Sequence, residues 1–163
     1  MAQVKPSILA AIPTDVLECT KQILCPFEKC KLSRYWDSIG LTWTIGWGCT
    51  GPEIHRGLTW NQTKADLELG KRLADTYSSL IHYSPKLALE HFKRQAAILD
   101  FVYNCGIGTY AHSTHLKAYV DRGEWSEVEE ILAQYDHGAQ GEEELGLKRR
   151  RAAEIVRLKE VES

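Results

Sequence analysis

The sequence predicts an α+β fold that is mostly helical, with a small antiparallel β-sheet in its N-terminal lobe. Three observations support this prediction. Residues 41–48 alternate with a period of two, as a half-buried strand does. From residue 59 onward, apolar side chains instead recur with the spacing of one helix face. The length of 163 residues, with 44% hydrophobic and 26% charged residues, suits one ordinary globular domain.

We expect a single domain with two lobes. No stretch approaches the ~18–20 apolar residues that a membrane span needs, and the apolar run before Pro13 is too short for an export signal. No internal repeat or low-complexity segment divides the sequence. The expected parts are an irregular lead-in, a small lobe that carries the catalytic residues, and a helical lobe, at residues 1–14, about 15–60 and about 60–163.

The small lobe is expected to begin with a helix and continue into the sheet. Asp15 and Glu18 have the spacing of a capping box, which predicts that a helix starts there. Pro26 lacks a backbone N–H, so this helix should end between Leu24 and Glu28. In the β-rich segment that follows, three large apolar residues should share one strand face: Trp43, Ile45 and Trp47.

The helical lobe contains several signals for the start of a helix. Thr59 and Gln62 form a second capping box, and Ser84 precedes a proline that can occupy the first turn of a helix. The run 96–103 is apolar except for Asp100, so we interpret it as the central core helix. Three further helices are expected to open at Ser113, at Ser126 and after Gly146.

The charge and the cysteines restrict the possible partners. A net charge of −2 gives no domain-wide basic excess, so we expect no nucleic-acid binding. Six basic side chains gather between Lys148 and Lys159, and we interpret them as a solvated helix face with local ion pairs rather than a contact with an anionic polymer. The five cysteines form no CxxC pair, which argues against a zinc site. We expect reduced thiols, while the sequence leaves a Cys25–Cys30 disulfide open.

Two carboxylates of the small lobe are candidates for acid–base chemistry. Glu28 is expected at a helix end and Asp37 nine residues later, before the sheet. Two carboxyl groups from separate elements around a cleft are the minimum for glycoside hydrolysis, in which one donates a proton and the other activates water or stabilises positive charge. Phe27, Trp36 and Trp43 could partly desolvate Glu28, as a general acid requires. The pair alone proves little, because the chain has 22 acidic residues.

The sequence around these carboxylates resembles the active-site signature of the phage lysozymes, glycoside hydrolase family 24. That signature is an F-E helix end, a following Asp and a T-I-G-x-G strand. Three motifs occur here in the family's order: Phe27-Glu28 through Asp37 with Thr44-Ile45-Gly46-Trp47-Gly48, then 95–106 with Ser113-Thr114, then Gly146-Leu147, Arg150-Arg151 and Glu154. The resemblance covers roughly residues 16–158, and three ordered motifs argue against coincidence.

The resemblance implies a lysozyme-like fold and a muramidase that cleaves, with inversion, the β-1,4 bond between N-acetylmuramic acid and N-acetylglucosamine. It implies Glu28 as general acid, and Asp37 with Thr44 as the groups that align water. The interval from Asp37 is one residue longer than in the family, so Thr42, on the same strand face, is an alternative to Thr44. The family has His where this chain has Cys49; we therefore expect Cys49 to pack as a small apolar group while other contacts hold its loop.

Three residues are candidates for substrate binding. Tyr103 and Asn104 end the core helix, where relatives present groups to the cleft, and His115 lies in the turn beyond it. His112 and His115 sit in a Ser/Thr-rich turn without a carboxylate partner, so we predict no metal site there. No cofactor is implied by the resemblance.

The implied partner is bacterial peptidoglycan, met by a monomer without nucleic acid and without stable membrane insertion. The resemblance to endolysins implies that the enzyme stays in the host cytoplasm until a holin pore releases it to the cell wall. Two alternatives remain. A lytic transglycosylase needs only one acid, so Asp37 and Thr44 argue against it. A catalytically silent wall-binding or phage structural protein is disfavoured by the presence of both carboxylates in register.

Overall fold

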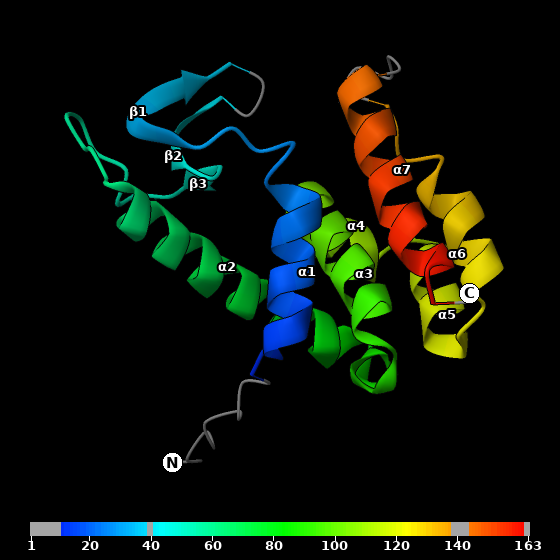
Figure 1. Ribbon diagram of the computed structural model, residues 1–163. Coiled ribbons are helices and arrows are strands. Elements are labelled where there is room, and N and C mark those ends of the chain that lie inside the picture. Colours follow the sequence, from blue (N-terminus) through cyan, green and yellow to red (C-terminus); the bar gives the residue numbers. More distant parts are fainter. Residues whose placement is uncertain (1–10, 39–40, 138–143, 162–163) are drawn as a thin grey trace, which may run out of the picture.

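The computed structural model describes residues 11–38, 41–137 and 144–161. A three-stranded sheet lies on one side and the helices on the other, with α2 running from the sheet into the helical part (Figure 1). This arrangement confirms the predicted α+β fold; residues 1–10 of the expected lead-in lie outside the described residues. The elements are α1 Thr14–Leu24, β1 Lys31–Asp37, β2 Thr42–Gly46, β3 Cys49–Thr50, α2 Gln62–Tyr83, η1 Pro85–Leu89, α3 Phe92–Cys105, α4 Ile107–Ala111, α5 Leu116–Arg122, α6 Trp125–Leu132 and α7 Leu145–Lys159.

Helix α1 does not use the capping box predicted for it. Its N-cap is Pro13 and no side chain caps it, while Asp15 Oδ1 accepts a hydrogen bond from the adjacent Val16 N–H at 2.8 Å. The helix ends at Leu24, before Pro26, as predicted. The helix buries the side chains Val16, Cys19, Thr20, Ile23 and Leu24.

The sheet has the order β1-β2-β3, and both pairings are antiparallel. Asp37 is the last residue of β1 and lies opposite Thr42, so it is part of the sheet. The prediction that Asp37 precedes the sheet is therefore wrong. Paired residues and every second residue share a face. One face therefore carries Tyr35, Asp37, Thr42 and Thr44, and the other carries Trp36 and Trp43.

The predicted apolar face of residues 43–47 is only partly correct. Strand β2 ends at Gly46, whose φ of 63° takes the backbone out of the strand, so Trp47 lies in the turn to β3. Ile45 is fully buried and packs with Cys49 and Ile54. Trp43, at the other end of the strand, stays 39% exposed.

Several helices begin away from their predicted start signals. Helix α2 is capped by Asn61, whose side chain accepts from Lys64 N–H at 2.8 Å, and Thr59 is instead bridged to Ser33 beside β1. Ser84 does precede a helix, which is the 3-10 helix η1, but its hydroxyl bonds Tyr110 OH at 2.7 Å and caps nothing. Helices α5, α6 and α7 begin at Leu116, Trp125 and Leu145, within three residues of the predicted signals, and the short helix α4 was not predicted.

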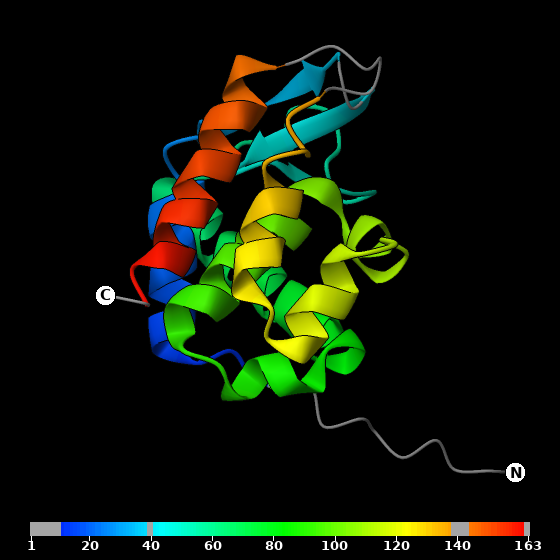
Figure 2. The same ribbon diagram turned by 90° about the vertical axis from the view of Figure 1, so that its right-hand side faces the viewer.

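Helix α3 is the centre of the core, as the sequence predicted. It packs against α1, α2 and α7, and its residues from Gln95 to Val102 are all buried. Helix α7 lies along the bundle and reaches the level of the sheet (Figure 2). One buried residue of α3 is charged: Asp100, with 0% exposure. The central helix therefore carries a carboxylate into the interior next to α7.

Candidate active site

Glu28 lies directly after α1, in the first turn beyond the helix, where its N–H still donates to Leu24 O at 3.0 Å. Its Oε1 accepts a hydrogen bond from Arg150 Nη1 at 2.7 Å. Its Oε2 faces Gly48, where a Cβ would come within 3.2 Å of that oxygen, on a backbone with φ of +81°. A side chain at position 48 would therefore be strained and would press on the carboxylate. Glu28 is held between α7 and the β2–β3 turn.

The aromatic cluster expected around Glu28 has a different arrangement. Trp36 is 51% exposed and contacts Trp43 edge-on, with 5.4 Å between ring centroids. The Arg34 guanidinium lies 3.7 Å from the centroid of Trp43. Both tryptophans are on the sheet face opposite Asp37. The partner that the structure gives Glu28 is Arg150, with Phe27 at 5.9 Å from that guanidinium.

Arg150 connects Glu28 to the core. Its Nε and Nη2 donate to the two carboxylate oxygens of Asp100, each at 2.9 Å, while Nη1 donates to Glu28. Burial opposes the charge of Arg150, but the hydrogen bonds and the negative charges of Asp100 and Glu28 outweigh it and raise the pKa of Arg150. Arg150 thus remains a cation, with only 4% of its side chain exposed.

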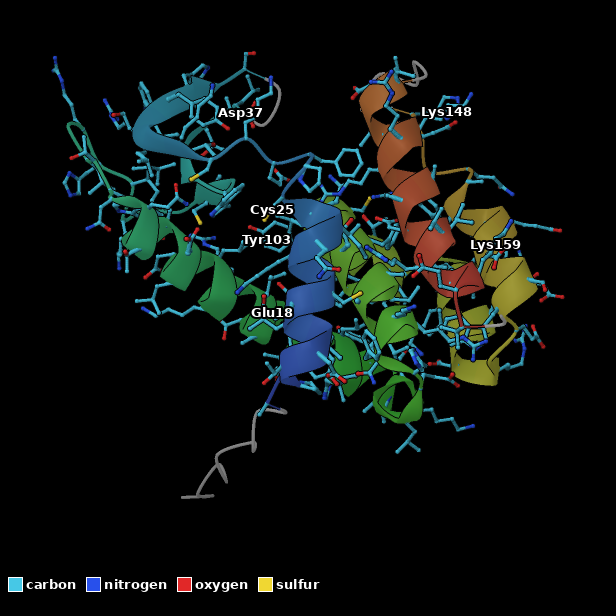
Figure 3. The ribbon with its side chains drawn as sticks, in the orientation of Figure 1. Glu18, Cys25, Asp37, Tyr103, Lys148 and Lys159 are labelled. Atoms are coloured by element: carbon cyan, nitrogen blue, oxygen red, sulfur yellow. The ribbon has the colours of Figure 1, made fainter. Side chains whose placement is uncertain are left out.

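Arg151, the next residue, is also buried. Its Nη2 donates to Glu154 Oε1 at 2.7 Å and to Asn104 Oδ1 at 2.9 Å. The prediction of a solvated basic face is therefore wrong for Arg150 and Arg151. It holds for Lys148 and Lys159, exposed at the two ends of α7 (Figure 3). The sequence did contain a signal for this pairing. Glu154 follows Arg151 by three residues, which is the spacing of an ion pair within one helix.

The second carboxylate and the threonine lie on one face of the sheet. Asp37 is opposite Thr42, and Thr44 is opposite Tyr35. Desolvation raises the pKa of Tyr35, and the charges of Asp37 and Glu28 raise it further. Thr44 is 2% exposed, and its Oγ1 has no hydrogen-bond partner among the described residues. No motif in the sequence had indicated Tyr35 as a functional residue.

A cavity of about 430 Å³ lies between the sheet, α2 and the end of α3. It is lined by Gly48, Thr50, Arg72, Asp75, Thr76, Ser79, Val102, Tyr103, Gly106 and Ile107. Gly48 lines this cavity and is also the neighbour of Glu28 Oε2, although Glu28 itself is not among the lining residues. The Tyr103 hydroxyl donates to Trp47 O at 3.0 Å, and Figure 3 shows this residue below the sheet that carries Asp37. Burial, and then the nearby Cys49 and Glu28, raise the pKa of Tyr103, which keeps the phenol neutral.

A model of the phage lysozyme family matches residues 26–154, which include every motif described above. The chain belongs to the phage lysozyme family. It is therefore a glycosidase that cleaves peptidoglycan, a lysozyme or endolysin of the phage type. No curated protein sequence matches the chain.

Solved structures of low sequence identity share the fold of this lysozyme. The active form of the P1 phage endolysin Lyz has a TM-score of 0.77 at 17% identity, covering 90% of this chain and 85% of that one. The muramidase domain of SpmX from Asticaccaulis excentricus has a TM-score of 0.74 at 21% identity, with coverages of 90% and 96%. The endolysin from Escherichia coli O157:H7 phage FAHEc1 has 0.72 at 20% identity, with 90% and 91%.

Cys49 of this lysozyme packs as a small apolar group, as predicted. It is 0% exposed between Ile45 and Ile54, and burial raises the pKa of its thiol. The loop after Cys49 is tied to the helical part by Arg72 of α2, which donates to Thr50 O at 2.6 Å and to Glu53 Oε1 at 3.0 Å. All five cysteines are free thiols, so the Cys25–Cys30 disulfide does not form.

The remaining binding candidates have different surroundings. Asn104 directs its Oδ1 at Arg151, inside the buried network. His115 stacks on Tyr119 and lines a separate cavity of about 260 Å³ between α5 and α6, which shares no lining residue with the cavity at Tyr103. Within the described part of the chain, no group of three or more His, Cys, Asp or Glu residues could hold a metal ion, and no helix is long and apolar enough to cross a membrane.

Proposed function

We propose that this lysozyme is an inverting muramidase that hydrolyses the β-1,4 bond between N-acetylmuramic acid and N-acetylglucosamine. Glu28 protonates the leaving oxygen, and Asp37 with Thr44 aligns the attacking water. The observation that carries this proposal is the position of Glu28: Arg150 occupies Oε1, and Oε2 lies against Gly48 at the edge of the cavity. One carboxylate oxygen is thus anchored, and the other lies beside Gly48, which lines the cavity.

Thr44 and Tyr103 support the same proposal. The Thr44 hydroxyl is buried and has no partner among the described residues, as expected of a group that completes its hydrogen bonds with a water molecule. We prefer it to Thr42 because Thr42 is less buried. Tyr103 lines the cavity beside Glu28 and is the substrate-binding candidate best supported by its surroundings. Asn104 and His115 remain weaker candidates, since one is engaged by Arg151 and the other lines a separate cavity.

The test is the lysis of purified peptidoglycan by Glu28→Gln, which keeps the shape of the side chain but removes the transferable proton. We expect the rate to fall by about a thousandfold or more while the fold is retained. Glu18→Gln is the matched control: Glu18 is on α1, has a 58% exposed side chain and pairs with Lys21 of the same helix, so its rate should be normal (Figure 3). Near-normal lysis by folded Glu28→Gln would disprove the assignment.

The products test the role of Asp37. If Asp37 and Thr44 align water, mass analysis should find reducing N-acetylmuramic acid ends, and NMR at early times should find the inverted anomer. Dominant anhydro-muramic ends would indicate a lytic transglycosylase instead. We further propose that the enzyme acts as a monomer and reaches the wall through a holin pore, so that expression in bacteria without a holin should leave the cells intact.

A further inference from the structure

The turn between β2 and β3 places Gly48 beside Glu28, and a glycine stands on each side of its central residue, Trp47. Gly46 and Gly48 have φ values of 63° and 81°, where a side chain would be strained. A Cβ at Gly46 would also meet the Trp60 ring at 2.9 Å, and a Cβ at Gly48 would come within 3.2 Å of Glu28 Oε2. Glycine therefore fits at both positions, but it leaves the backbone its greatest freedom. The contacts of Trp47 then decide how firmly the centre of the turn is held.

Trp47 is bound to the helical part of the molecule through both its side chain and its backbone. Its indole Nε1 donates a hydrogen bond to Asp66 Oδ1 of α2 at 2.7 Å. Its carbonyl oxygen accepts a hydrogen bond from the Tyr103 hydroxyl of α3 at 3.0 Å. Its ring is half-buried and packs against the main hydrophobic core. The centre of the turn is thus held at three points by elements outside the sheet.

The two partners of Trp47 are themselves fixed. Gln62, one helical turn before Asp66, donates its Nε2 to the same Oδ1 at 2.7 Å, so this oxygen is directed by two hydrogen bonds. Tyr103 lies in the last turn of α3, within the helix that forms the centre of the core. Burial raises the pKa of its phenol, so the hydroxyl keeps the proton that it donates to Trp47 O. Both hydrogen bonds therefore join the turn to rigid helices.

We propose that Trp47 is a positioning residue of the active site: held from α2 and α3, it keeps the β2–β3 turn in place beside the Glu28 carboxylate. The proposal rests on Glu28 being the general acid. Arg150 of α7 binds Oε1 of Glu28, and the turn lies at the other oxygen, Oε2. A turn that moved away from Oε2 would let the carboxyl group rotate about its single hydrogen bond to Arg150. A displacement of about 1 Å at a reacting group can reduce catalysis by about 100-fold.

Conservative variants can remove each hydrogen bond of Trp47 separately. Tyr103→Phe deletes the hydroxyl but keeps the ring that lines the cavity. Asp66→Leu deletes the acceptor of the indole, whereas Asp66→Asn keeps a side-chain oxygen that can accept the same hydrogen bond. Tyr83→Phe is the matched control for the hydroxyl, because Tyr83 is 43% exposed at the end of α2 that lies away from the sheet (Figure 1).

The first experiment is NMR of the ¹⁵N-labelled enzyme, which follows the indole N–H of Trp47 and the backbone amide of Gly48. The indole signal is identified by its absence in Trp47→Phe. We expect the Gly48 signal to shift in Tyr103→Phe and in Asp66→Leu, and to stay at its wild-type position in Asp66→Asn and Tyr83→Phe. An unchanged Gly48 signal in both folded Tyr103→Phe and folded Asp66→Leu would overturn the proposal. This measurement does not depend on activity, so it separates the placement of the turn from the assignment of the general acid.

The second experiment compares turnover of soluble peptidoglycan fragments. We expect kcat to fall by about tenfold in Tyr103→Phe and in Asp66→Leu with KM within about twofold, because the turn is lost as a support while substrate binding remains. Asp66→Asn and Tyr83→Phe should keep a kcat within about twofold of the wild type. Trp47→Phe and Asp66→Leu remove the same hydrogen bond, so their effects on kcat should not add in the double variant.

Two results of this experiment would overturn the proposal. One is a normal kcat in folded Asp66→Leu and Tyr103→Phe. The other is a raised KM with unchanged kcat in Tyr103→Phe, which would make the hydroxyl a substrate contact and not a support of the turn. Activity of folded Glu28→Gln is the separate result that would remove the proposed function itself.

Discussion

Replacing Glu154 by glutamine should stabilise this lysozyme, and the gain should increase with pH. In the unfolded chain Glu154 titrates near its ordinary pKa of 4.5, whereas burial raises its pKa in the folded protein. The folded state therefore binds more protons above pH 4.5, and stability is lost as the pH rises toward the folded pKa. Each pH unit in that interval removes about 1.4 kcal/mol from the free energy of unfolding.

Glutamine has no proton to lose, so the variant avoids this loss. The difference in free energy of unfolding between variant and wild type should therefore grow from pH 5 to pH 7, by at most about 1.4 kcal/mol for each pH unit. Urea unfolding followed by circular dichroism at pH 5, 6 and 7 measures it, with Glu160→Gln as the exposed control. A difference that stays constant with pH, or shrinks, would refute the reasoning.

Three further predictions follow from the site. Thr44→Val should leave the fold intact, since the buried hydroxyl has no protein partner among the described residues, but should lower kcat by about 10²-fold, while Thr44→Ser keeps most of it. Cys49→Ser should destabilise by about 1–3 kcal/mol and Cys49→Ala by less, with turnover per folded molecule unchanged in both; loss of activity in a folded variant would make Cys49 functional. Thiol titration of denatured, freshly purified protein should count five thiols, and three or fewer would contradict the free cysteines.

The catalytic candidates could be predicted because they lie in one short stretch. Glu28, Asp37 and Thr44 are close in sequence, and the helix end and strand that carry them follow from Pro26 and from the alternation of residues 41–48. The network behind them could not be predicted in this way. Arg150 is 50 residues from Asp100 and 122 from Glu28, and a pair that forms only on folding leaves no periodic pattern in the sequence.

The start of α2 shows why a local signal can fail. Thr59 with Gln62 was the predicted cap, whereas Asn61 caps the helix in the structure by accepting from Lys64 N–H. The choice between them is tertiary: Trp60 N–H donates to Leu32 O at 2.8 Å, and Thr59 is bridged to Ser33. This pairing holds residues 59 and 60 in extended backbone beside β1, so the helix can begin only after Asn61. The pairing of residues 59 and 60 with β1 could not be predicted from the sequence alone.

The many charged residues of α7 predicted a helix face in contact with solvent. Composition alone does not distinguish such a face from a buried ionic network, because arginine and glutamate occur in both. Arg150, Arg151 and Glu154 occupy inward positions where a core helix usually carries apolar residues. Apolar replacements of similar volume at such positions are often neutral or stabilising, so stability gives little reason to keep the charges. Such a replacement at Arg150 would leave Glu28 without its partner. The polar interior of α7 is thus better explained by the demands of the active site than by those of the fold.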